Sequence, residues 1–210
     1  MFVRPLETRP LSLKQGDNKH AASTLNFCIS PCVSEGAIET QRGFIHGRQL
    51  VQNPVDLDFH MRAMALGFRR DHSVHSPGLI EVPTPGVAAT IPLGVLYDSA
   101  SDFPSVGHAW LFLVLEAIKI WPAFLCAIRC LYADNHAYAD DGGLIIYLFA
   151  ILSGILQGCP LSGTLFVFVI DPLLWMFRKQ INSAIIRACA DDIGAALRRL
   201  EDLAVLYNIS

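Results

Sequence analysis

Two pairs of adjacent aspartates are the residues of this chain best suited to metal chemistry. Asp191-Asp192 lies between two apolar runs, residues 185–190 and 193–197, whereas Asp140-Asp141 follows the polar pair Asn135-His136. Carboxylates supply the hard oxygen ligands that divalent ions need when they handle phosphate groups. An isolated Asp-Asp pair is also typical of an ordinary solvated turn. The elements around each pair must therefore decide between the two interpretations.

The surroundings favour Asp191-Asp192 as the chemical site. Ile185–Ala190 and Ile193–Leu197 read as two strands, which predicts a hairpin with the carboxylates at its tip. Asp140-Asp141 leads instead into Gly142-Gly143, a pair that favours an exposed hairpin turn.

The rest of the chain predicts a mixture of helices and short strands. A helix from Ala21 to Ile29 should end at Pro31, because proline lacks the N–H that a helix interior needs. The other helices are expected over Gln49–Phe68, Val106–Ile120, residues 122 to about 132, Leu161–Gln180 and from Arg198 onward, with strands over Gly94–Tyr97 and Leu144–Leu156. Val106–Ile120 is apolar on all sides and should be buried.

Composition excludes a disordered chain and gives no strong sign of nucleic-acid binding. The 210 residues are 52% hydrophobic and 17% charged, with a net charge of −3. Residues 1–70 hold nine Lys and Arg against six Asp and Glu, or +3, and residues 71–210 hold seven against thirteen, or −6. A basic first part and an acidic second part fit a phosphate-gripping lobe joined to a metal-binding one.

The six cysteines leave two interpretations open. Cys28 and Cys32, like Cys126 and Cys130, are four residues apart, which places both thiols on one face of a helix. A zinc site would use such pairs, but neither is a CxxC and no histidine stands at finger spacing. Small buried hydrophobic residues are the favoured interpretation. Met1–Lys19 lacks the apolar region of a signal peptide, so an intracellular protein of the nucleus or cytoplasm is expected.

A run without charges, Gly142–Ile170, raises the alternative of a membrane protein. The run is interrupted by the polar and turn-forming segment Gln157–Gly163. The apolar piece before it, Leu144–Leu156, has thirteen residues and is too short to cross a bilayer. Two buried elements joined by a functional turn are the better interpretation, and no membrane contact is expected.

Four motifs follow one another along the chain. They are Arg9-Pro-Leu-Ser with Gln41-x-Gly-Phe-x-x-Gly-Arg48, then Leu96-Tyr-Asp98-Ser-Ala-Ser-Asp-Phe103-Pro-Ser-Val106, then Gln157-Gly-Cys-Pro-Leu-Ser162, and last Ala188-Cys-Ala-Asp191-Asp192. In this order they resemble the motifs of the reverse transcriptases of non-LTR retrotransposons and group II introns. Their order and spacing carry the resemblance, which covers the chain apart from its proline-rich stretch. Tyr138-Ala-Asp-Asp141 spells the family's best-known tetrapeptide, but it precedes the Gln157 motif, whereas the family's tip follows it.

The resemblance implies a two-metal nucleotidyl transfer. Asp98 and Asp191 would hold two Mg²⁺ ions, with Mn²⁺ as a possible substitute, and Asp192 would assist. Cys189 stands where most relatives have Tyr or Phe, next to the turn that would position the primer end.

The same resemblance implies nucleotide-binding residues. Phe103 corresponds to the steric gate against a ribose 2′-OH, and Gln157 to a contact with the incoming nucleotide or the template base. Lys19 and Arg48 would touch phosphates from the fingers. Asp102 stands where relatives usually have alanine, so its carboxylate would repel a triphosphate unless it faces away or binds metal.

The implied fold is α+β, the fingers and palm of a right-hand polymerase with an antiparallel palm sheet backed by helices. Fingers would occupy residues 1–92, including a proline-rich loop at 72–92, and the palm 93–210, with motifs at 98–106, 157–166 and 188–193. Thumb and endonuclease regions are expected beyond this chain.

The implied reaction is RNA-templated DNA synthesis, with an RNA template, a DNA primer and dNTPs as partners. A catalytically inactive fragment with the same fold is the alternative. Because the family places much of its grip on the duplex in the thumb, the 210 residues alone are expected to be inert.

Overall fold

The structure is a computed structural model that describes residues 16–71, 91–97, 102–156 and 158–209. These residues form helices and two antiparallel sheets, which confirms the α+β prediction. They divide into two compact units. Unit 1 comprises the described residues up to 33 and from 102 to 169, and unit 2 those from 34 to 97 and from 170 to 209. The boundary between fingers and palm at residue 92 was predicted from the positions of the motifs, and it stays a prediction.

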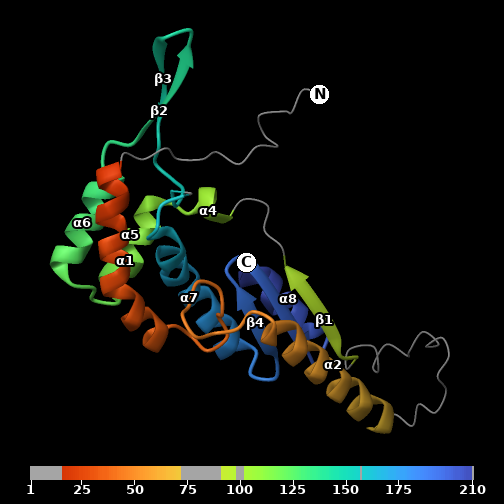
Figure 1. Ribbon diagram of the computed structural model, residues 1–210. Coiled ribbons are helices and arrows are strands. Elements are labelled where there is room, and N and C mark those ends of the chain that lie inside the picture. Colours follow the sequence, from red (N-terminus) through yellow and green to blue (C-terminus); the bar gives the residue numbers. More distant parts are fainter. Residues whose placement is uncertain (1–15, 72–90, 98–101, 157, 210) are drawn as a thin grey trace. The chain divides into compact units, whose positions relative to one another are not determined.

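Unit 1 is built mainly from helices. Its elements are α1 (Gly16–Gly36), α4 (Asp102–Ser105), α5 (His108–Ala117), α6 (Pro122–Tyr132), β2 (His136–Asp141), β3 (Leu144–Ala150) and α7 (Ser162–Gln180), of which α1 and α7 continue into unit 2 (Figure 1). Pro122 opens α6, where a missing N–H costs nothing. Leu115, Ile128 and Leu165 are fully buried in the core of this unit.

Two predictions for the helices of unit 1 are wrong. The first helix does not end at Pro31 but runs through it to Gly36. Ile29 and Val33 are buried on either side of the proline, so packing outweighs the local loss of one helical hydrogen bond. Helix α5 is not buried on all sides, since Trp110 and Leu113 are exposed.

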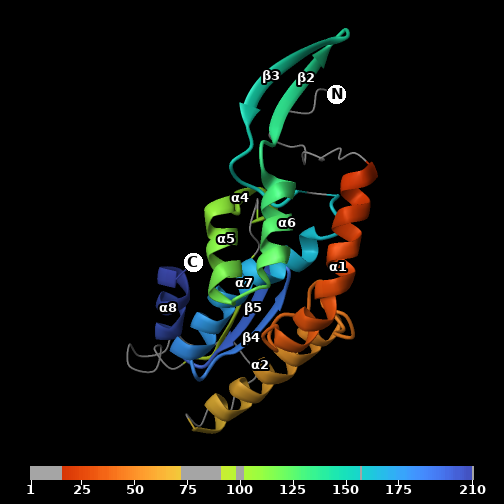
Figure 2. The same ribbon diagram turned by 90° about the vertical axis from the view of Figure 1, so that its left-hand side faces the viewer.

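The strand after Gly142-Gly143 is also different from the prediction. It ends at Ala150, and every residue of β3 is exposed, so the expectation of a buried element is wrong. Among the described strands it pairs with β2 alone, in a two-stranded sheet that stands clear of the helices of unit 1 (Figure 2). Gly142 and Gly143 have φ values of 62° and 91°, which confirms the expected exposed turn after Asp140-Asp141.

Unit 2 contains the sheet that carries the second aspartate pair. Its antiparallel strands β1 (Leu93–Tyr97), β5 (Asp192–Leu197) and β4 (Ile185–Cys189) lie in that order. Helix α2 (Gln52–Asp71) covers one face. The helix comes close because two strand positions are glycine: a Cβ on Gly94 or Gly194 would lie 2.4 Å from a side-chain atom of α2.

The other face of this sheet packs on the second half of α7 and on α8 (Glu201–Ile209). Alternate residues of β4 and β5 face this core, as the period of a strand requires. The buried cluster consists of Leu174, Phe177, Ile181, Ile186, Ala188, Ile193, Ala195, Leu197 and Leu206. The predicted hairpin of two strands at residues 185–197 is therefore confirmed.

The cysteines are mostly not the buried residues that were expected. Cys28, Cys32, Cys126 and Cys130 are exposed, and Cys159 is buried. Other residues form the buried faces of the two helices, such as Ile29 in α1 and Ile128 in α6. Within the described ranges, no group of three or more His, Cys, Asp or Glu is arranged to hold a metal ion. In the same ranges, no helix has the length and apolarity needed to cross a membrane.

Candidate active site

The turn between β4 and β5 presents the second aspartate pair. Cys189 pairs with Asp192, so that Ala190 and Asp191 form a two-residue loop. Asp191 is partly exposed and Asp192 is exposed, while Ala190 is buried. Ala190 has a φ of 58°, a left-handed conformation that residues with a Cβ rarely adopt. The tip therefore combines accessible carboxylates with a strained backbone.

The neighbouring strand approaches the same tip. Tyr97, the last residue of β1, pairs with Ile193, which directly follows Asp192. Asp98, the residue after Tyr97, lies outside the described residues. The end of β1 and the start of β5 are thus side by side at the aspartate pair.

A segment of the predicted fingers motif extends the sheet on its other side. The main-chain carbonyl of Thr40 accepts a hydrogen bond from the N–H of Ala188 at 2.8 Å, and the N–H of Arg42 donates to the carbonyl of Ala188 at 2.9 Å. Gln41 and Ala188 form a parallel bridge between these bonds. The fingers motif therefore pairs directly with the strand that leads into the aspartate tip.

The side chain of Gln41 reaches the turn itself. Gln41 is fully buried, and its Oε1 accepts hydrogen bonds from the N–H groups of Gly43 at 2.8 Å and Ala190 at 3.1 Å. Its Nε2 donates to the carbonyl of Ala190 at 3.4 Å. Gly43 is closely packed against the same residue, since a Cβ there would lie 2.3 Å from the nitrogen of Ala190. Ala190 is thus held from two positions of one loop.

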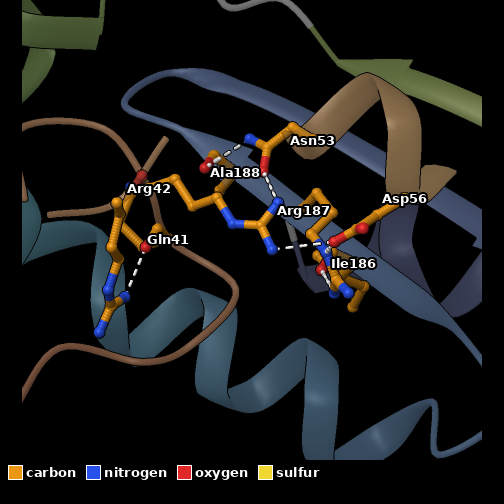
Figure 3. A network of polar contacts seen from close by, with 8 residues as sticks. Gln41, Arg42, Asn53, Asp56, Ile186, Arg187 and Ala188 are labelled. Carbon is orange, nitrogen blue, oxygen red and sulfur yellow. Dashed lines mark hydrogen bonds and ion pairs between the residues drawn. The ribbon is translucent and has the colours of Figure 1, made fainter. Parts of the chain in front are cut away.

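A charged network fixes the part of β4 that leads into the turn (Figure 3). Buried Asn53 donates to the carbonyl of Ala188 at 3.0 Å and accepts from Arg42 at 3.0 Å. Arg42 and Arg187 both bind Oδ2 of Asp56, at 2.8 and 2.9 Å. The hydrogen bond from Arg187, followed by that from Arg42, lowers the pKa of Asp56 below its ordinary value. The carboxylate is therefore ionised at neutral pH and ties α2 to β4.

Arg48, which was predicted to touch phosphate, binds main-chain carbonyls of its own loop. Its guanidinium makes four hydrogen bonds to the main-chain carbonyls of Ser34, Ala37, Ile38 and Gln41. These bonds occupy most of its five donors and satisfy one carbonyl in the last turn of α1 and three in the loop that follows it. This geometry favours a loop-fixing role for Arg48 over phosphate binding.

Asp171 holds the start of the same loop. Its Oδ2 accepts the N–H of Ile38 at 3.1 Å, while its Oδ1 is buried and has no hydrogen-bond partner in the described part of the chain. Burial raises the pKa of Asp171 to about 6, although the Ile38 N–H and the charge of Arg48 act in the opposite direction. The carboxylate is thus less stable in its ionised form than an exposed aspartate.

Of the nucleotide-binding residues predicted outside unit 2, the structure describes the side chains of Phe103 and Lys19. Phe103 is half-buried and stacks on buried Phe166, with ring centroids 4.3 Å apart and an angle of 12° between the rings. Lys19 is exposed on α1. Gln157 and the side chain of Asp102 lie outside what the structure describes.

The motif around Gln157 forms the expected turn into α7. Ser162 Oγ donates to the carbonyl of Leu156 at 2.5 Å, and the N–H of Cys159 donates to the same carbonyl at 3.2 Å. Gly158 has a φ of 82°, a conformation that glycine adopts without strain.

The supporting residues Gln41, Asn53, Asp56 and Arg187 were not predicted as part of the site. Gln41 belonged to one of the four motifs, and Asn53 and Asp56 were only part of the helix expected over Gln49–Phe68. The partners lie more than 130 residues apart in the chain, as with Arg187 and Asp56. No local pattern indicates such a pairing.

Comparison with solved structures gives the class of the fold. The chain is similar to apo telomerase from Candida tropicalis, truncated from its C-terminal domain, with a TM-score of 0.53 over 91% of this chain and 36% of that one. The fold is therefore polymerase-like, with helices and antiparallel sheets; sequence identity is 10%, so the likeness concerns the fold alone.

Comparison of sequences identifies a transposon relative. The chain is 26% identical over 204 residues to an uncharacterized 149 kDa protein of transposon TX1 from Xenopus laevis. The match covers 93% of this chain and 14% of that protein, so this chain spans a small part of its relative's length. No family model matches the chain.

Proposed function

We propose that unit 2 carries the catalytic carboxylates of a reverse transcriptase, an RNA-templated DNA polymerase of a transposable element. The register between β1 and β5 is the observation that carries this proposal. Tyr97 pairs with Ile193, so the residues that precede Asp98 and follow Asp192 are neighbours across two strands. A metal site of this kind needs carboxylates from adjacent strands, and this is the arrangement that the register favours.

The donor set fits hard divalent cations. Asp191 and Asp192 offer accessible oxygen ligands, to which we add Asp98. Burial raises the pKa of the Cys189 thiol, and the negative charges of Asp192 and Asp191 raise it further. The tip is therefore a place of negative potential. Two Mg²⁺ ions, or Mn²⁺ in their place, would supply Lewis acidity and neutralise developing charge.

The proposed reaction joins a deoxynucleotide to a DNA primer. The primer 3′-OH attacks the α-phosphate of a dNTP, the bond to the β-phosphate breaks, and pyrophosphate leaves. RNA would serve as the template. Phe103, Gln157 and Lys19 are proposed to contact the nucleotide or nucleic acid, on the resemblance of their motifs alone.

Divalent cation binding tests the site directly in these 210 residues. Mn²⁺ should broaden the amide NMR signals of residues 189–193, and Asp191→Ala should abolish this broadening. A double variant, Asp140→Ala with Asp141→Ala, is the matched control and should leave it unchanged. Broadening centred on residues 140–143 instead would refute the choice of site.

Primer extension tests the reaction itself. The protein to use is the product of the longest reading frame that contains these residues, with a homopolymer RNA template and an annealed DNA primer. We expect Mg²⁺-dependent extension that is lost in Asp191→Ala. Cation binding at the tip without any extension would favour a catalytically inactive relative with the same fold.

A further inference from the structure

The turn that carries Asp191 has an unfavourable backbone conformation. A two-residue hairpin loop with positive φ at its first position normally has glycine there, but this chain has Ala190. A left-handed alanine is costly, and such a residue persists only where its surroundings determine its conformation. The surroundings of Ala190 therefore need an explanation.

One side chain satisfies both main-chain polar groups of Ala190. Gln41 accepts its N–H at 3.1 Å and donates to its carbonyl at 3.4 Å, across 149 residues of sequence. The amide is fully buried, so water does not compete for these bonds. A second accepted bond, from the N–H of Gly43 at 2.8 Å, fixes the orientation of the Gln41 amide.

We propose that Gln41 is a positioning residue, which holds the Ala190-Asp191 turn so that the Asp191 carboxylate stays in one place for a divalent cation. This inference rests on the proposed function. Gln41 would not contact the substrate, and it acts through Ala190. A purely structural glutamine would stabilise the loop without affecting cation affinity, and this difference makes the two roles separable.

The neighbouring residue offers a matched control. Thr40 is buried like Gln41 and lies in the same loop, but its Oγ1 has no hydrogen-bond partner among the residues that the structure describes. Its main-chain carbonyl, which binds the N–H of Ala188, is retained in any variant. Thr40→Val therefore changes a buried side chain of this loop without removing a bond to the turn. Gln41→Met removes the bonds and keeps the approximate volume.

Two measurements on the 210-residue chain test the inference. In Gln41→Met, amide hydrogen exchange at Ala190 should accelerate about tenfold, the effect of losing roughly one net hydrogen bond, while exchange at Ile186 stays unchanged. Mn²⁺ affinity, followed by titration, should fall by about the same factor. Thr40→Val should match the wild type in both. If circular dichroism shows that Gln41→Met does not fold, Gln41→Asn replaces it with the same expectations, because the shorter amide cannot span all three partners.

The outcomes separate this inference from the proposed function. Wild-type Mn²⁺ binding with unchanged affinity in Gln41→Met would overturn the positioning role and leave the proposed function intact. Unchanged exchange at Ala190 in Gln41→Met would also overturn it. Failure of the wild-type chain to bind Mn²⁺ at the tip would contradict the proposed function, and the positioning role with it.

Discussion

The two aspartate hairpins of this chain have similar sequences and different supports. The β2–β3 hairpin has Asp140-Asp141 before a Gly-Gly turn, and β3 is exposed along its whole length. The β4–β5 hairpin has Asp191-Asp192 in a three-stranded sheet, with α2 on one face and a buried core on the other. The comparison teaches that an Asp-Asp pair gains a defined geometry from its tertiary support.

The two turns also differ in what holds them. At the first hairpin, Asp140 accepts the N–H of Gly143 at 2.8 Å, a contact within the turn. Glycines there adopt positive φ without cost. At the second, the left-handed Ala190 is held by Gln41 from a distant segment. Strain that is maintained by distant contacts is typical of sites whose geometry matters.

The largest expected difference between the hairpins is catalytic. Asp191→Ala should reduce primer extension on the order of a thousandfold or more, since the loss of a metal ligand removes several kcal/mol of transition-state stabilisation. Asp140→Ala, in the exposed hairpin, should leave the rate within about twofold, as expected for a surface change. Initial rates in the longest reading-frame product give both values. A loss of similar size in Asp140→Ala would remove the distinction between the hairpins.

The second largest difference is expected in the free energy of unfolding, when glycines near the two turns are replaced by alanine. Gly43→Ala should destabilise unit 2 by about 3 kcal/mol, because the new Cβ would lie 2.3 Å from main-chain nitrogen of Ala190 and the buried loop must shift. The added Cβ of Gly142→Ala meets no atom of the described residues within 4 Å, but the residue keeps a φ of 62°, so the change should cost only about 1 kcal/mol, within its own hairpin.

Urea denaturation followed by amide signals of each unit measures both effects. If Gly43→Ala is tolerated as well as Gly142→Ala, the loop around Gln41 does not constrain the turn. In that case the loop at Gly43 can move away from Ala190 without loss of stability, and the support for the second hairpin is weaker than proposed.

Local patterns were sufficient to predict much of the fold. The apolar runs around Asp191-Asp192 predicted β4 and β5, and Gly142-Gly143 predicted the exposed turn, because strand period and turn chemistry are short-range properties. The Gln157 motif likewise predicted the turn before α7.

Long-range packing was not predictable from those patterns. Nothing local indicates that Gln41 bonds Ala190, or that packing carries α1 through Pro31. Exposure of β3 also contradicted its apolar sequence, because hydrophobicity alone does not show which partner a strand has.

A smaller effect concerns pH and the loop that holds the second hairpin. The pKa of Asp171 is raised to about 6 from 3.8, mainly by burial. The protonated carboxyl group of Asp171 therefore contributes its full stability to the folded state below pH 3.8, and this stability is lost as pH rises to about 6. Asp171→Asn, which keeps an oxygen acceptor for Ile38, should stabilise unit 2 by roughly 1–2 kcal/mol at pH 7, after allowance for partial exposure.

Urea titrations of Asp171→Asn and wild type at pH 7 and pH 4 measure this effect. The two proteins should have nearly equal stability at pH 4. A variant that is less stable than wild type at pH 7 would show that the ionised carboxylate, with the charge of Arg48 and the N–H of Ile38 favouring it, contributes more than its burial costs.

The smallest expected effect lies in the first hairpin and tests its independence. Tyr138 and Tyr147 are directly opposite in the register, with ring centroids 5.9 Å apart and an angle of 74° between the rings. Such a cross-strand aromatic pair contributes about 0.5–1 kcal/mol. Tyr147→Ala should therefore accelerate amide exchange in residues 144–150 by a few-fold, since an isolated two-stranded hairpin has little other support. Leu148→Ala, an exposed residue of the same strand, is the control and should have less effect. Exchange at Ile186 and Ala188 should not change in either variant. If Tyr147→Ala accelerates exchange in β4 as well, the first hairpin is coupled to the second, and the contrast between an independent hairpin and a supported one is wrong.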